Sequence, residues 1–136
     1  MIYLDNAATT RKKPAAVYKA MLKTALLGGG NAGRGNGVLS LGAVRVIIET
    51  QEAAAELFGI EDESSIVFTQ NATYALNMAI LGTLKPNDHM LATVMDHNSV
   101  LRPAVRHGNY SIAGADSIGY VSPAAVRRRI TDKTAL

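Results

Sequence analysis

The 136-residue sequence predicts an α/β fold with a mainly parallel sheet and flanking helices. Short apolar runs alternate with stretches in which apolar residues recur every three or four positions, as expected for strands that alternate with helices. The apolar runs cover residues 66–69, 90–95 and 110–113, and a further run begins at residue 134. Because three parallel strands would leave open edges, we expect the sequence to be the first part of a larger fold.

Three stretches in the first part of the sequence have the spacing and the end signals of helices. The first covers residues 14–27, beginning at Pro14 and ending at three glycines. The second is the strongest, over residues 38–58, and Gly59 is a suitable stop. The third covers residues 72–81 and follows directly on a short polar turn.

Two shorter helices are predicted in the second half. Ser99 is expected to cap a helix over residues 100–106, which Pro103 limits to about one or two turns. Ser122 is expected to cap a second helix over residues 124–130, with a proline in its first turn.

The composition excludes several classes of function. Hydrophobic residues make up 48% and charged residues 18%, which is typical of a globular domain, and no apolar run could span a bilayer. The absence of cysteine excludes disulfides, thiolate zinc sites and a cysteine nucleophile within these residues. A net charge of +3 and 5% aromatic residues argue against nucleic-acid binding. The sequence shows no signal peptide and no metal-ligand spacing. We therefore expect a cytoplasmic protein that binds no membrane, no nucleic acid and no metal ion.

The stretch from Ile66 to Leu81, IVFTQNATYALNMAIL, is typical of a strand, a tight turn and the start of a helix. The unpaired N–H groups and positive dipole end of such a helix form an anion site. Thr69, Asn71 and Thr73 place hydrogen-bonding side chains around the same point. The pattern therefore predicts a turn that holds a phosphate group.

A second polar segment, Asp96 to Ser99, follows the next predicted strand, and ligands gather at the carboxyl ends of parallel strands. His97 could stack on a flat cofactor or move protons near neutral pH. On spacing alone, a loop histidine that is hydrogen-bonded to the backbone is slightly favoured over either of these functions. Asp96 is expected either to orient His97 or to cap the next helix.

The glycine loop at residues 28–37, GGGNAGRGNG, lacks the preceding strand of a nucleotide-binding loop and the Lys-Ser or Lys-Thr of a phosphate loop. A connector is the favoured interpretation. Arg34, its one long charged residue, could reach an anionic group. Asn6 lies in an N-terminal segment, residues 1–13, that is either an extended arm or a loop along a site.

Four motifs together resemble the class V aminotransferases, and within them the cysteine desulfurase and selenocysteine lyase group. In order they are MIYLDNAATT, GGGNAGRGNGVLSL, IVFTQNATYALNMAI and MDHNSVLRP, and the resemblance covers essentially the whole sequence. It implies the N-terminal part of the large domain of a fold type I transferase that depends on pyridoxal 5′-phosphate. We therefore expect one incomplete domain, with an arm over residues 1–13 and the start of the cofactor-binding domain over residues 14–136.

The resemblance also implies roles for individual residues. Ala72 and Thr73 match the pair that binds the cofactor phosphate, largely through backbone N–H groups, and Asn71 lies beside them. His97 matches the histidine that stacks on the pyridine ring and assists proton transfer.

The resemblance also implies a loop at the substrate or partner site, which contains Arg34 and Asn6. In the family, the active site near this arginine often belongs to the partner subunit. The sequence departs from the family pattern at Tyr74, where an acidic residue is usual, and at Asn36 and Gly37, where a histidine is common.

The implied reaction removes sulfur from L-cysteine, giving alanine and an enzyme persulfide. The implied partners are a second copy of the chain, in a homodimer, and a sulfur-acceptor protein. The family's Schiff-base lysine and sulfur-accepting cysteine have no counterpart here, so the chain alone is expected to be inactive. The alternatives are a non-catalytic remnant, a phosphate-binding module, or a class V aminotransferase that acts on another amino acid.

Overall fold

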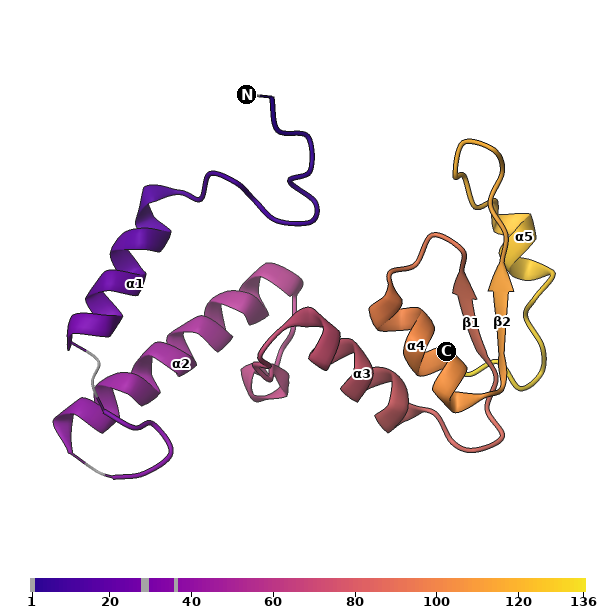
Figure 1. The fold of residues 1–136 in the computed structure, drawn as a ribbon. Helices are drawn as coiled ribbons and strands as arrows, with labels where there is room; N and C mark the ends of the chain where they lie inside the picture. The colour runs from indigo at the N-terminus through magenta and orange to yellow at the C-terminus, as the bar shows by residue number, and fades with distance from the viewer. Residues whose placement is uncertain (1, 28–29, 36) are drawn as a thin grey trace. The chain divides into compact units, whose positions relative to one another are not determined.

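The computed structural model describes residues 2–27, 30–35 and 37–136, and Figure 1 shows its elements. The chain divides into two compact units, Met1–Val67 and Phe68–Leu136. No helix within the described ranges is long and apolar enough to cross a membrane. The expected single incomplete domain over residues 1–136, with its arm over residues 1–13, stays a prediction.

The first unit contains the helices α1 (Ala15–Leu27) and α2 (Val38–Phe58) and a short 3-10 helix, η1 (Glu63–Ser65). The apolar spacing predicted both α-helices at nearly these bounds. Gly59 ends α2 with a φ of 66°, a left-handed conformation that glycine adopts without steric cost. The stop signal read from the sequence is therefore confirmed.

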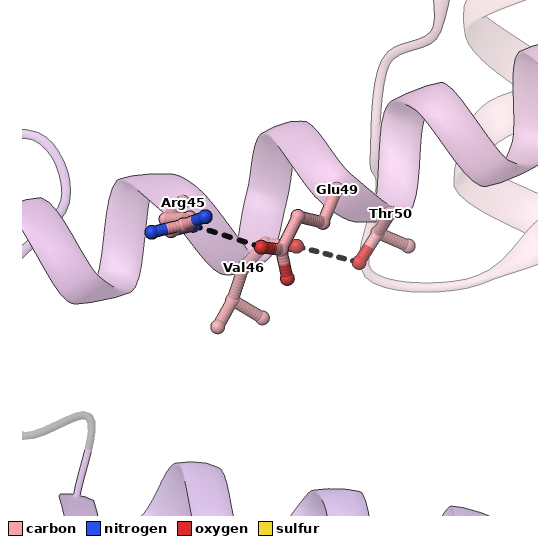
Figure 2. A network of polar contacts seen from close by, with 4 residues as sticks. All are labelled: Arg45, Val46, Glu49 and Thr50. Atoms are coloured by element: carbon pink, nitrogen blue, oxygen red, sulfur yellow. Dashed lines mark hydrogen bonds and ion pairs between the residues drawn. The ribbon is translucent and has the colours of Figure 1, made fainter.

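Two of the polar contacts on the surface of α2 stay within the helix, as Figure 2 shows. Arg45 Nε donates to Glu49 Oε1 at 2.9 Å, and Thr50 Oγ1 donates to the carbonyl of Val46 at 2.6 Å. Both members of the ion pair are exposed, so the pair adds well under about 1 kcal/mol to stability.

Residues 66–69 do not form the predicted strand. Ile66 has extended dihedral angles, and its carbonyl accepts a hydrogen bond from Gln51 Nε2 at 2.7 Å. Val67 and Phe68 are exposed. A strand needs ladder hydrogen bonds to a neighbouring strand. Among the described residues, no strand pairs with this segment. The prediction of a strand here is wrong for that reason.

The second unit is a small α/β layer, which confirms the predicted fold class. Its elements are α3 (Ala72–Thr83), β1 (Met90–Thr93), α4 (Asn98–His107), β2 (Tyr110–Ala113) and α5 (Pro123–Arg127). The two strands pair in parallel, from Met90 opposite Tyr110 to Thr93 opposite Ala113. Figure 1 shows α4 connecting them, the crossover that parallel strands require.

A further segment begins to pair along β1, at residues 133–136. His89 N donates to Lys133 O at 2.7 Å, and Ala135 N donates to His89 O at 3.0 Å. The bridge between His89 and Thr134 is parallel. The expected strand start at Thr134 is thus present as a first parallel bridge.

The core of the second unit lies where α3 and α4 meet β1. Its buried residues are Ile80, Met90, Ala92 and Ala104. Burying apolar surface stabilises this layer by roughly 25 cal/mol per Å². Because α3 and α4 pack on the same small core, the relative position of the two helices is fixed.

Two elements are shorter than predicted. β1 ends at Thr93 instead of residue 95, because a turn follows in which Asp96 Oδ2 accepts from Thr93 N at 2.6 Å. The carbonyl of Thr93 in turn accepts from Asp96 N at 3.2 Å. α5 begins as predicted, after Ser122, but ends at Arg127 instead of residue 130.

Candidate functional site

The turn at the start of α3 presents two backbone donors without acceptors. Asn71 caps the helix: its Oδ1 accepts from Tyr74 N at 2.9 Å, and its carbonyl accepts from Ala75 N at 3.1 Å. The N–H groups of Ala72 and Thr73 have no hydrogen-bond acceptor among the described residues. Unpaired N–H groups at a helix N-terminus attract anions, so this turn is suited to a phosphate group.

The three polar side chains predicted around this turn have different tasks. Thr69 Oγ1 donates to the carbonyl of Asn71 at 2.9 Å, and the Asn71 side chain is used as the cap. The Thr73 hydroxyl has no hydrogen-bond partner in the part of the chain that the structure describes. Thr69 and Asn71 therefore shape the turn, and Thr73 has a hydroxyl available for a ligand.

His97 is the N-cap of α4, a role that the sequence assigned to Ser99. His97 Nδ1 accepts from Ser99 N at 3.2 Å and lies 2.9 Å from Ser99 Oγ. The helix consequently begins at Asn98, and the predicted start at Val100 is wrong. Asp96 neither orients His97 nor caps α4, because its carboxylate is bonded to the turn that precedes them.

The helix α4 continues through Pro103 for ten residues, longer than the one or two turns predicted. Proline has no N–H for the carbonyl four residues earlier, which is that of Ser99. Asn77 Nδ2, from α3, lies 3.5 Å from Ser99 O and donates to Thr73 O at 2.8 Å. Asn77 thus provides the missing donor and connects the start of α3 with the start of α4.

These groups meet at a cavity of about 450 Å³ within the second unit. It is lined by Thr73, Asn77, His97, Asn98, Ser99 and Arg102. The structure therefore brings Thr73 of the predicted phosphate turn and His97 to one cavity. Asn77 and Arg102 were not predicted as site residues. Each lies four residues after a residue of the site, Thr73 or Asn98, and so shares its helix face.

The other two predicted site residues lie in the first unit. Asn6 Oδ1 accepts from Arg11 N at 3.3 Å, so its side chain is bonded within the arm. Arg34 lies in the glycine loop, where its N–H donates to Asn31 O at 3.3 Å. Their place at a substrate or partner site stays a prediction. Three positions of the predicted glycine loop lie outside the described residues, namely 28, 29 and 36.

A parallel sheet with a ligand site at the carboxyl ends of its strands is typical of α/β ligand-binding proteins. The family profile described as "Aminotransferase class-V" matches residues 2–136, nearly the whole sequence. The chain therefore belongs to the class V aminotransferase family, and the predicted resemblance is confirmed.

Relatives from several bacteria are cysteine desulfurases or probable ones. A probable cysteine desulfurase of Synechocystis sp. is 34% identical over 107 residues, which cover 76% of this chain and 25% of the relative. A cysteine desulfurase of Bradyrhizobium diazoefficiens is 32% identical over 142 residues, covering 99% of this chain and 36% of the relative.

A solved structure shares the fold. The crystal structure of the cysteine desulfurase CsdA from Escherichia coli superposes with a TM-score of 0.73 at 24% identity, covering 97% of this chain and 35% of that one. The chain thus spans about a quarter to a third of the length of the proteins that it resembles. At this identity the likeness supports the fold, as part of a fold type I large domain.

Proposed function

We propose that this chain forms the cofactor-phosphate end of a pyridoxal-phosphate-dependent enzyme of the cysteine desulfurase type. The observation that carries the proposal is the cavity shared by Thr73, at the start of α3, and His97, at the start of α4. Two N–H groups and a hydroxyl that have no partner among the described residues lie at or beside it, together with the guanidinium of Arg102. No carboxylate is among its lining residues, so the donor set fits a phosphate group.

The residues at the start of α3 and His97 each have a proposed task. The backbone N–H groups of Ala72 and Thr73 hold the phosphate, and Asn71 keeps the turn in shape. His97 would contact the ring of the cofactor and would hold or move a proton there. When bound, pyridoxal phosphate supplies an electron sink for the substrate carbanion, and the protein orients it.

The complete reaction is proposed for the protein to which these residues belong. It would remove sulfur from L-cysteine, with Arg34 and Asn6 at the substrate or at the partner subunit's site. The names of the relatives support this choice over an aminotransferase of other substrates. We also propose a cytoplasmic homodimer with a sulfur-acceptor protein as its partner. Because the 136 residues contain no cysteine to carry a persulfide, we propose that the chain alone is inactive.

The phosphate contact is tested by binding pyridoxal phosphate to the full chain and to the variant Ala72→Pro. Proline at the first helical position removes one N–H and suits the extended backbone of Asn71 before it. A hydrogen bond to a charged group contributes about 1.5–3 kcal/mol, so the dissociation constant should rise by about tenfold or more.

The matched control is Ala72→Ser, which keeps the N–H and should bind as the unchanged chain does. Pyridoxal, which lacks the phosphate, should bind weakly to all three proteins. Binding of inorganic phosphate without binding of pyridoxal phosphate would support the phosphate-binding module instead. Equal affinities for Ala72→Pro and Ala72→Ser would overturn the proposed contact.

A further inference from the structure

Ser99 is a buried residue whose two donors contact the same nitrogen of His97. The residue is only 6% exposed to solvent. The backbone N–H lies 3.2 Å from His97 Nδ1, and the hydroxyl oxygen lies 2.9 Å from it. The two groups differ in one respect: the N–H can only donate, whereas the hydroxyl can donate or accept.

The backbone contact fixes the neutral form of the imidazole. Because Ser99 N–H donates to Nδ1, this nitrogen carries no proton, and the proton of neutral His97 is on Nε2. Among the described residues, Nε2 has no hydrogen-bond partner, and His97 lines the cavity. The neutral ring can therefore offer an N–H to a ligand.

We propose that Ser99 is a positioning residue that lets His97 take up a proton on Nδ1 without leaving the cavity. A proton on Nδ1 breaks the bond from the backbone N–H, which has no lone pair to offer. The hydroxyl turns about its C–O bond and accepts from Nδ1–H over the same 2.9 Å. The ring thus keeps one bond to Ser99 in both of its protonation states.

Among the described residues, no group other than Ser99 is hydrogen-bonded to His97 Nδ1, and this includes Asn98, which also lines the cavity. From α3, Thr73 and Asn77 line the cavity and carry no charge; from α4, Arg102 is a cation and cannot accept a proton. The carboxylate of Asp96 is bonded to Thr93 N. Ser99 is thus the acceptor that the structure places at Nδ1. The use of this proton in catalysis rests on the proposed function. The contacts between Ser99 and His97 are independent of that function.

The test follows His97 by NMR in the full, nitrogen-15-labelled chain without cofactor, at neutral and at acidic pH. In the unchanged chain, Nε2 should carry the proton of the neutral ring. The nuclear Overhauser contacts between the ring and Ser99 should persist after protonation. In Ser99→Ala the neutral form should be the same, but these contacts should be lost when the ring is protonated. Ser99→Thr should restore them.

His107 is the internal control, because its Nε2 lies 2.6 Å from the carbonyl of Asp88 and must donate there in every variant. A neutral His97 with its proton on Nδ1 in the unchanged chain would overturn the proposal, whether or not the variants fold. Unchanged ring contacts in protonated Ser99→Ala would also overturn it. Since no cofactor is present, neither result depends on the phosphate contact proposed above.

Discussion

At the scale of single residues, His89 and His97 use their imidazole nitrogens differently. His89 is buried, and its Nδ1 and Nε2 lie 2.8 and 2.9 Å from the hydroxyls of Thr134 and Ser111. His97 is exposed, and one nitrogen caps α4. The sequence identified His97 by its place after a strand. It could not identify the role of His89, because Ser111 and Thr134 are 22 and 45 residues away along the chain.

The first prediction concerns this buried histidine. His89→Ala removes both hydrogen bonds and leaves two hydroxyls without their partner, so the free energy of unfolding should fall by about 2–4 kcal/mol. Urea denaturation measures the change. His97→Ala, which removes only a helix cap, should cost about 1 kcal/mol. The structural role assigned to His89 is wrong if its substitution costs no more than that of His97.

At the scale of elements, the first residues of helices were predicted well where the N-cap is a common one. Asn71 and Ser122 accept hydrogen bonds from the first turns of α3 and α5, as their residue types suggest. The start of α4 was misplaced because the cap is an imidazole and a serine follows two positions later. Its length was underestimated because the donor that compensates for Pro103 comes from another helix, and such a contact leaves no local pattern.

The second prediction separates the two tasks of the α3 cap. Asn71→Ala should lower the stability of the chain by about 1 kcal/mol, whereas Asn71→Asp should retain it, since a carboxylate caps equally well. The same carboxylate lies beside the proposed phosphate and should weaken pyridoxal-phosphate binding by like-charge repulsion. Thermal unfolding and a binding titration measure the two effects. Undiminished binding by Asn71→Asp would place the phosphate elsewhere.

The third prediction concerns η1, which Asp62 caps. Hydrogen bonds from the side chain of Ser64, and then from its N–H, hold the pKa of Asp62 below its usual value. A lowered pKa means that this cap stabilises η1 above about pH 4 and that the stabilisation is lost as the pH falls through the folded-state pKa. The amide resonance of Ser64 should shift over that range, and it should stay constant in Asp62→Asn. An equal shift in both proteins would contradict this cause.

At the scale of the whole molecule, the alternation of apolar runs and helical spacing was enough to predict an α/β fold with a parallel sheet. It was not enough to predict that residues 66–69 pair with no strand in the part of the chain that the structure describes, because strand pairing depends on a neighbour and not on the segment itself. The cavity also depends on contacts between segments that are distant in the sequence. Thr73 and His97 were each recognisable from local patterns, but their meeting depends on how α3 and α4 pack on the core around Ile80 and Met90.

The fourth prediction follows from exposed apolar side chains in the first unit. Met21 and Leu26 on α1 are 65% and 73% exposed, and Leu41 on α2 is 60% exposed. Such surfaces favour association, so the apparent mass should rise with protein concentration in sedimentation experiments. Leu26→Glu should reduce this association, whereas Lys23→Glu should not. A monomer at every concentration would contradict the prediction.

The central claim is that the start of α3 holds a cofactor phosphate beside His97, and amide shift mapping tests it most directly. The nitrogen-15-labelled chain is titrated with pyridoxal phosphate and, separately, with pyridoxal. We predict that pyridoxal phosphate shifts the amide resonances of Ala72 and Thr73 and the ring resonances of His97, and that pyridoxal leaves the two amides unchanged. Shifts of the same size with pyridoxal, or shifts confined to residues outside this cavity, would contradict the claim.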